Sequence, residues 1–232
     1  MTSSSSDTGQ TGLALVIDLS ASLYLALLDS KANVLSSRIR EQGARGETAH
    51  ILLDECLEEI NYKPKAIEKI CVGIGPGSFT GIRVGIALTQ GFAFARQLPI
   101  YPFSSLTAMV TSVATISKSK EKHIVAAIAA NGGQYFVRTE DPVIEALIPG
   151  AKLISMASQD QLLVTSGRII EAERLGNIFG QVFRLEECIH FQSIFEMATL
   201  NPPILDGVIR PNYLQVSAAE EKRRLFTPEN LK

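Results

Sequence analysis

The chain has 232 residues, which suits one large domain or two domains of modest size. Of these residues 46% are hydrophobic, and the formal net charge is −2, so the chain lacks the basic surplus that drives sequence-independent binding to nucleic acid. Its three cysteines are odd in number and lie far apart in the sequence, which argues against a disulfide framework and a zinc knuckle and favours a reducing cytoplasmic environment.

The first part of the chain predicts no targeting segment. Residues 1–12 are small and polar, without the basic start and apolar stretch of a signal peptide, so we expect a disordered tail. Every long apolar run is interrupted before it reaches the roughly 20 residues of a membrane span. We therefore expect a soluble, cytoplasmic protein without a membrane partner.

The first half of the sequence predicts a three-strand meander followed by alternating helices and strands. Residues 13–40 contain three short strands, of which the first ends at Asp18. Residues 48–60 repeat apolar side chains at helical spacing, and Pro64 keeps that helix from continuing. The elements expected next are a strand at 69–75, a helix at 82–96, a strand at 100–103 and a helix that begins at Ser104 or Ser105. The order is β-β-β-α-β-α-β-α, which predicts an α/β protein.

The second half gives weaker signals of the same kind. Residues 123–130 and 133–140 predict a hairpin through the glycines at 132 and 133. Short segments at 152–155 and 162–167 and a helix near 193–200 follow. This half therefore looks like a shortened copy of the first.

Residues 72–91, VGIGPGSFTGIRVGIALTQG, contain six glycines but fit no enzyme motif. Ser78 stands where the dinucleotide fingerprint needs its third glycine, and the strand that follows ends without an acidic residue for a ribose. No lysine follows Gly81, which excludes a P-loop. Pro76 and Thr80 stand where a nucleophile elbow around Ser78 needs glycines. The simpler interpretation is that these glycines let the loop approach a neighbouring backbone closely.

The helix at 82–96 carries small residues every four positions, at Ala87, Gly91 and Ala95. Its other faces are also largely apolar, so both sides of the helix need cover. The sequence leaves two alternatives open: burial of all faces within this chain, or a surface that docks a partner.

Several segments together resemble the TsaB (YeaZ) family: LVIDLS, VGIGPGSFTGIRVGIALTQGFA, YPFSSLTAM, AAIAANGGQYFV and IRPNYLQ. The resemblance runs over most of residues 13–215, and its GPGSFTGIRVG block is highly specific. It implies an actin/Hsp70-like (ASKHA) fold with two stacked βββαβαβα halves, the second shortened. We expect a first domain at 13–116, a second at 117–205 and a C-terminal segment at 206–232 that returns to the first domain and ends in a mobile tail.

The resemblance also implies a function. TsaB-like proteins are implied to be non-catalytic subunits that pair with a TsaD-like transferase, with a TsaE-like ATPase in a larger complex. That machinery makes threonylcarbamoyladenosine next to the anticodon of ANN-reading tRNAs, so tRNA would be bound only through the complex. Alternatives are an active ATPase or metallopeptidase of the same fold, and a homodimer through the same helices.

Docking is implied to use the helices at 48–60 and 82–96 as half of a four-helix bundle. The expected partner-binding residues are Leu52, Cys56, Arg83, Val84, Ala87, Leu88, Gly91 and Ala95. The expected structural loop residues are Gly75, Gly77, Ser78, Thr80 and Gly81.

We expect no catalytic residue, metal or cofactor in the chain. TsaD relatives hold a metal through an H-x-x-x-H pair, and Ser105 and Met109 take those places here, which makes a poor site for a hard metal. His50 and Asp54 are four residues apart on a helix, but two ligands without a third are more often a solvated face. Asp18 ends the first strand, where actin-like ATPases keep an acid, and we interpret it as a turn-capping carboxylate.

The sequence departs from the family pattern at three places. A histidine expected at the start of the first helix is replaced by Glu47, with His50 in the following turn. The family block D-A-R-x-G-E-V-Y is A-A-N-G-G-Q-Y here, so the cleft at Ala130 and Asn131 lacks an acid and an arginine. The N-terminal tail has no family counterpart. The one basic cluster, Lys222 to Arg224, follows two glutamates, so we expect weak tRNA binding by the isolated chain.

Overall fold

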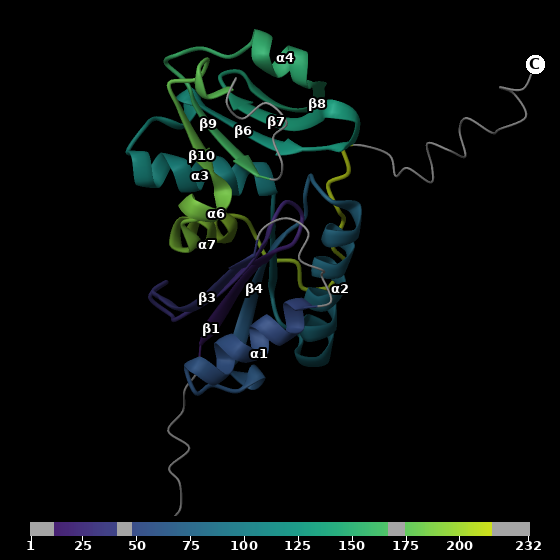
Figure 1. Ribbon diagram of the computed structural model, residues 1–232. Helices are drawn as coiled ribbons and strands as arrows, with labels where there is room; N and C mark the ends of the chain where they lie inside the picture. Colours follow the sequence, from purple (N-terminus) through teal and green to yellow (C-terminus); the bar gives the residue numbers. More distant parts are fainter. Residues whose placement is uncertain (1–11, 41–47, 167–174, 215–232) are drawn as a thin grey trace, which may run out of the picture.

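The computed structural model describes residues 12–40, 48–166 and 175–214, which form two five-stranded sheets joined by helices (Figure 1). The first sheet contains β1 (Leu13–Asp18), β2 (Leu23–Leu28), β3 (Val34–Arg40), β4 (Ile67–Gly73) and β5 (Ile100–Phe103). The second contains β6 (Ile124–Ala129), β7 (Gln134–Glu140), β8 (Val143–Pro149), β9 (Leu162–Ser166) and β10 (Gln181–Arg184). The helices are α1 (Ala49–Glu59), α2 (Phe79–Arg96), α3 (Ser105–Ser117), α4 (Gly150–Ser155), α6 (Leu185–Cys188) and α7 (Phe191–Thr199).

The two sheets have the same topology. The strand orders are β3-β2-β1-β4-β5 and β8-β7-β6-β9-β10. In each sheet the first strand lies at the centre, antiparallel to the second strand and parallel to the fourth. The second half thus repeats the first, as the sequence predicts.

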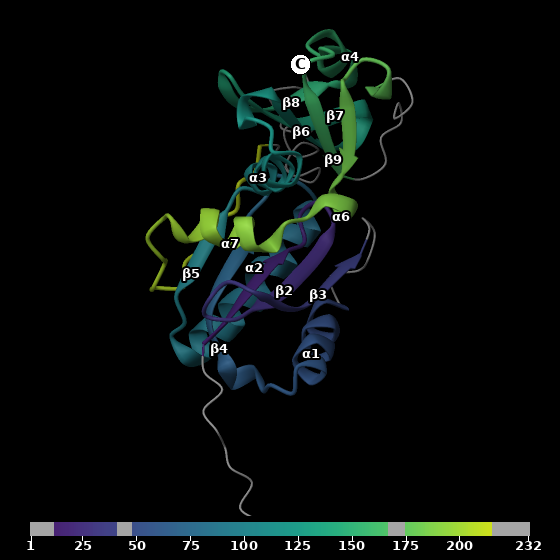
Figure 2. The ribbon, with the colours of Figure 1, turned by 90° about the vertical axis from the view of Figure 1, so that its left-hand side faces the viewer.

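Helices cover both faces of the first sheet, so β1 and β2 are buried at every position. The side chains of α1 and α2 pack on one face with alternate residues of β1 and β2. The opposite face packs against α7, which contacts α3, and α3 and α6 in turn contact the second sheet. Figure 2 shows α2 and α7 on opposite sides of the first sheet. On the far face of the second sheet lie α4 and the chain at 175–179.

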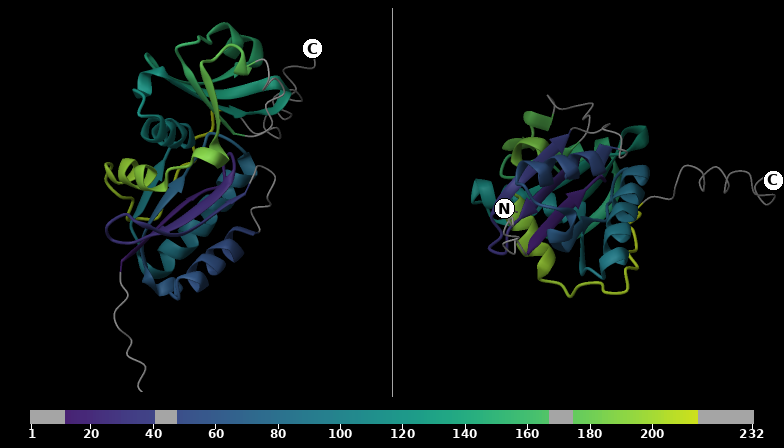
Figure 3. Two further views of the ribbon diagram at one scale, coloured as in Figure 1. Left: turned by 60° about the vertical axis from the view of Figure 1, so that its left-hand side comes forward. Right: turned by 90° about the horizontal axis from the view of Figure 1, so that it is seen from below.

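The C-terminal part of the chain crosses back to the first half. We expected residues up to 205 in the second domain, but α7 packs on β1, β4 and β5 of the first sheet. The chain then runs round the edge of that sheet to α2 (Figure 3), where Ile204 pairs with Ile100 of β5. Since Phe191 and Ile194 of α7 are apolar and buried, this helix needs a sheet face, and the sequence alone does not say which sheet supplies it.

Local sequence explains where α2 begins and ends. The Ser78 side chain accepts a hydrogen bond from the Gly81 N–H, so the helix begins at Phe79 rather than at residue 82 as predicted. Gln97 adopts a left-handed conformation and ends it. Residues 152–155 belong to α4, while β8 and β10 were not predicted. Within the described residues, no helix is long and apolar enough to cross a membrane.

Candidate docking surface and interdomain cleft

The glycine block at 72–91 closes directly on the turn between β1 and β2. A Cβ atom at Gly77 would lie 2.2 Å from the Ser20 carbonyl oxygen, and one at Gly81 would lie 1.9 Å from that of Leu19. The Ser78 N–H donates to the Ser20 carbonyl at 2.6 Å. Gly75 has φ +97°, a conformation that favours glycine. These glycines therefore allow the chain's own backbone to approach closely.

Asp18 lies completely buried beside this loop. Its carboxylate accepts hydrogen bonds from the Ser20 N–H at 2.7 Å and the Tyr24 hydroxyl at 3.2 Å, and the Ser20 hydroxyl in turn donates to Ser105 at 2.6 Å. Burial raises the pKa of Asp18, although hydrogen bonds from Ser105, Ser20 and Tyr24 oppose the shift. Burial and the nearby Asp18 also raise the pKa of Tyr24 well above its usual range. The bond to Ser20 is the turn-capping contact expected for Asp18.

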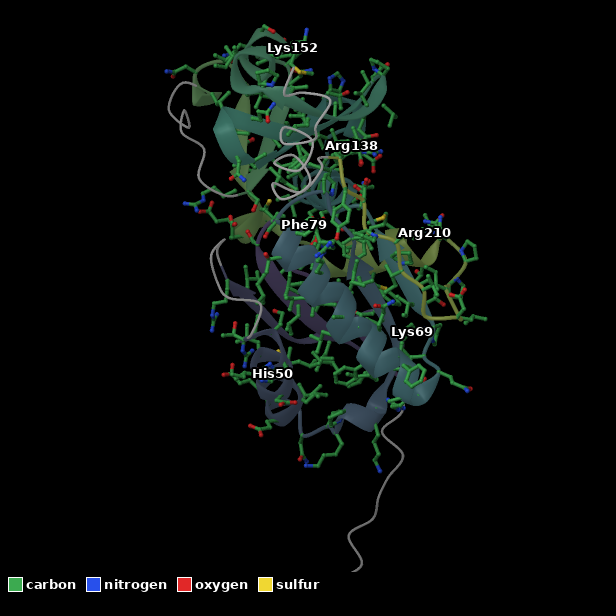
Figure 4. All side chains as sticks on the ribbon, turned by 90° about the vertical axis from the view of Figure 1, so that its right-hand side faces the viewer. His50, Lys69, Phe79, Arg138, Lys152 and Arg210 are labelled. Carbon is green, nitrogen blue, oxygen red and sulfur yellow. The ribbon has the colours of Figure 1, made fainter. Side chains whose placement is uncertain are left out.

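The positions aligned with a metal-binding histidine pair are part of the core. Ser105 is buried at the first turn of α3, and Met109 is fully buried one turn later. His50 and Asp54 lie exposed on α1, where Figure 4 labels His50. Among the residues that the structure describes, no group of three or more His, Cys, Asp or Glu is placed to hold a metal ion.

Hydrogen bonds between side chains of the first and second halves join the two halves. The Ser22 hydroxyl, from the β1–β2 turn, lies 2.7 Å from that of Ser166 at the end of β9. Both hydroxyls also contact Oε1 of Glu186 at the start of α6. One polar cluster therefore joins three segments that are far apart in the sequence.

A second cluster, on β8, is centred on Glu145. Its carboxylate accepts hydrogen bonds from Ser104, the N-cap of α3, at 2.7 Å and from Arg138 at 2.9 Å. It also accepts one from the Asn212 side chain at 3.2 Å. Asn131, where the family block has its arginine, is exposed at the β6–β7 turn and makes none of these hydrogen bonds. The two clusters hold the halves together through side chains that the sequence analysis did not single out.

The expected docking residues of α2 divide between two faces. Arg83, Ala87, Gly91 and Ala95 are exposed, Val84 and Leu88 are partly buried, and no atom lies within 4 Å of a Cβ placed at Gly91. Phe94, on the exposed side and not predicted as a site residue, is 91% exposed. The structure thus leaves one face of this apolar helix uncovered by the described residues, which favours the partner-surface alternative.

On α1 the expectation needs correction. Leu52 is 5% exposed and Cys56 is fully buried, and both pack against the first sheet, so neither presents its side chain to a partner. The exposed residues of α1 are His50, Ile51, which is 49% exposed, and the acidic side chains around Asp54. The sequence analysis assigned the inward stripe of α1 to docking, although the outward side chains lie one position away from it.

Three residues at the N-terminal end of α2 form a stack. The Arg83 guanidinium carbon lies 3.8 Å from the centroid of the Phe79 ring, and Phe79 stacks on Tyr213 with ring centroids 4.9 Å apart. Arg83 Nε donates to the Tyr213 hydroxyl at 3.1 Å. Sequence analysis missed Tyr213, since nothing in its local sequence shows that it lies beside residues more than 130 positions earlier.

Sequence comparisons relate this chain to named proteins. The family described as "TsaD: tRNA N6-adenosine threonylcarbamoyltransferase" matches residues 43–174, more than half of the chain. The chain is 36% identical over 102 residues to the tRNA threonylcarbamoyladenosine biosynthesis protein TsaB of Haemophilus influenzae, and 37% identical over 70 residues to that of Escherichia coli. The chain belongs to the TsaB (YeaZ) family.

The sequence matches cover only part of this chain and of its relatives. The sequence match covers 43% of this chain and 42% of the H. influenzae protein, and 30% and 29% for the E. coli protein, so it spans less than half of either relative. A Pseudomonas aeruginosa protein described as similar to the peptidase YEAZ has the same fold, with a TM-score of 0.68 and 20% identity over 88% of this chain and all of that one. The predicted ASKHA-type fold is confirmed.

Proposed function

We propose that this chain is a non-catalytic subunit that docks a TsaD-like transferase and supports the formation of threonylcarbamoyladenosine in ANN-reading tRNAs. A TsaE-like ATPase would join the same assembly, and tRNA would be bound through the complex. The names of the relatives, tRNA threonylcarbamoyladenosine biosynthesis proteins, support the pathway.

The observation that carries the non-catalytic role is the close packing of the glycine block on the β1–β2 turn, beside the buried Asp18. The Leu19 and Ser20 carbonyls of this turn lie against Gly81 and Gly77. The acid at the end of β1 is buried and accepts hydrogen bonds from side chains and backbone of this chain. A nucleotide phosphate would have to displace these contacts before it reached Asp18.

The docking role is supported by the exposed stripe of Arg83, Ala87, Gly91 and Ala95 on α2. Small side chains allow a second helix to approach closely, and burial of the apolar neighbours Phe94 and Leu88 would supply affinity. The same stripe could pair two copies of this chain, which is the main competing outcome.

The test is reconstitution with the TsaD-like and TsaE-like proteins of the same organism. Threonylcarbamoyladenosine in tRNA is measured with and without this chain, and with the Gly91→Glu variant. That variant should fold, because the position is open. It should weaken binding to the TsaD-like protein by at least about thirtyfold and reduce modification, because it places an unpaired charge in the interface.

Thr115→Glu is the matched control, since Thr115 is an exposed helical residue on α3 rather than α2. It should bind and support modification as the unchanged chain does. Modification that proceeds equally without this chain, or ATP turnover by the isolated chain that Asp18→Ala abolishes, would contradict the proposal.

A further inference from the structure

The N-terminal end of α2 carries Arg83, whose guanidinium is held by neighbouring side chains. Its two terminal nitrogens donate to no residue that the structure describes. Only two residues of α2, Arg83 and Arg96, are charged. Arg96 Nη1 donates to the Pro64 and Ile67 carbonyls, at 3.1 and 2.6 Å, so it is bound to its own domain. Arg83 is therefore the one charged side chain of α2 that remains for a partner.

The position of the Arg83 guanidinium is fixed from two sides. Its flat face lies on Phe79, and Nε donates to the Tyr213 hydroxyl. Phe79 stacks in turn on Tyr213, so the three side chains support one another. Neither Nη atom of Arg83 donates to any residue that the structure describes. An arginine in this state keeps the two parallel donors that match a carboxylate.

Tyr213 reaches this place because the C-terminal segment at 204–214 is bound along the flank of α2. The Gln90 side chain donates to the Gly207 carbonyl at 2.7 Å, and the Asn212 N–H donates to the Ile74 carbonyl at 2.8 Å. Ile209 is buried among the side chains beneath α2. In Figure 4 this segment, marked by Arg210, runs beside α2 on the side away from α1, and Phe79 lies at the end of α2 nearest the second domain.

We propose that Arg83 pairs with a carboxylate of the partner that docks on α2, and that Tyr213 is a positioning residue for this contact. The inference rests on the proposed docking function and gives it a polar anchor. The other exposed residues of the stripe are small and uncharged, so they allow close approach but do not fix how far a partner helix slides along it. One bidentate pair at its end sets that register.

The physical argument is one of preorganisation. A free arginine side chain loses rotamer entropy when a partner fixes it, which reduces affinity. Here Phe79 and Tyr213 have already restricted the guanidinium, so less entropy is lost on binding. Among the described residues no acidic side chain of α1 contacts Arg83, so we expect the carboxylate to come from a partner.

The experiment measures the dissociation constant of the full-length chain and the TsaD-like protein of the same organism, at low and at high salt. Arg83→Glu should weaken binding by at least about tenfold at low salt, because it sets two like charges against each other. Arg83→Lys should not retain full affinity, since lysine has neither the two parallel N–H donors nor the planar surface that stacks on an aromatic ring. Lys152→Glu, the same change of charge on exposed α4, is the matched control and should leave affinity unchanged.

Tyr213→Phe separates positioning from structure. It keeps the ring against Phe79 but removes the hydroxyl that accepts from Arg83, so affinity should fall by about three- to fivefold with the urea unfolding midpoint nearly unchanged. In the Arg83→Glu background the same change should have no further effect, because the contact is already lost.

The carboxylate can also be located directly. A carbodiimide activates partner carboxylates, and the amine introduced by Arg83→Lys should form an amide with one of them, found by mass spectrometry of the complex. If the dissociation constant of Arg83→Glu lies within twofold of that of the unchanged chain while Gly91→Glu abolishes binding, the proposed role of Arg83 is wrong and the docking function stands. No binding of the unchanged chain to the TsaD-like protein, or pairing only with a second copy, would overturn both.

Discussion

Two glycines of α2 should respond in opposite directions to the same substitution. At Gly81, a Cβ atom would lie 1.9 Å from the Leu19 carbonyl oxygen and 2.9 Å from its carbon. The β1–β2 turn would have to move by about 1 Å to restore a normal contact, and the adjacent bond from the Ser78 N–H to Ser20 would weaken. At Gly91, no atom lies within 4 Å of the added Cβ.

The magnitudes follow from these contacts. Overpacking costs about 1–3 kcal/mol, and loss of the hydrogen bond costs about 0.5–1.5 kcal/mol. The greater helical preference of alanine than of glycine stabilises the folded state by about 0.5–1 kcal/mol, which offsets part of this cost. Gly81→Ala should therefore lower the free energy of unfolding by about 0.5–4 kcal/mol, while Gly91→Ala should raise it by about 0.5–1 kcal/mol.

Urea unfolding of both variants, followed by circular dichroism, measures this difference. Each kcal/mol should also shift the melting temperature by about 2–4 °C for a chain of this size. A Gly81→Ala variant as stable as the unchanged chain would refute the close packing of the glycine block on the β1–β2 turn. That result would also remove the structural argument for a non-catalytic role, which depends on this packing.

Three other measurements test the interior. The pKa of Asp18 is raised above its ordinary value of 3.8, so the folded state holds this proton more tightly than the unfolded chain does. The free energy of unfolding should therefore fall as the pH rises from 3.8 through the raised pKa of the folded state. Asp18→Asn should remove this part of the pH dependence of urea unfolding. Burial raises the pKa of Cys71 and of Cys188 to about 12, so iodoacetamide at about pH 8 should modify both slowly in the folded protein and quickly in urea; equal rates would show that they are not buried. Ser22→Ala removes two contacts across the cleft, to Ser166 and Glu186, and should lower the free energy of unfolding by about 1–2 kcal/mol; an unchanged value would show that the cluster does not hold the halves together.

The elements with strong local patterns could be predicted from the sequence. The strands β1 and β2 are nearly continuous apolar runs, because helices cover both faces of the sheet, and α1 shows its buried stripe in its spacing. By contrast β8 and β10 are edge strands without a buried residue, so burial does not impose on them the pattern of a core strand. The placement of α7 and of the segment at 204–214 depends on contacts between residues far apart in the chain, which local patterns do not contain.

The candidate site was predicted unevenly for a related reason. A helix that is apolar on all sides shows that something must cover it, but it does not show which side its own sheet covers. On α1 the apolar stripe of Leu52 and Cys56 is the buried side, and the partner-facing candidates are the residues next to it. The buried serine hydrogen bonds could not be predicted either. The serines at 22, 105 and 166 look like ordinary loop and helix residues until the fold brings them close to their partners.

The glycine block itself holds information that a count of glycines does not use. Gly81 and Gly85 lie one turn apart on the side of α2 that faces Leu19, whereas Gly91 lies six residues after Gly85 and points away from the sheet. At 100° per residue, six residues turn the helix by about 600°, which is about 240° beyond a full turn. The inward glycines let the loop and helix close on the β1–β2 turn, and the outward one leaves room for another helix. One continuous motif therefore has two structural roles: its first half packs closely on the β1–β2 turn, and its second half provides the surface on which we propose that a partner docks.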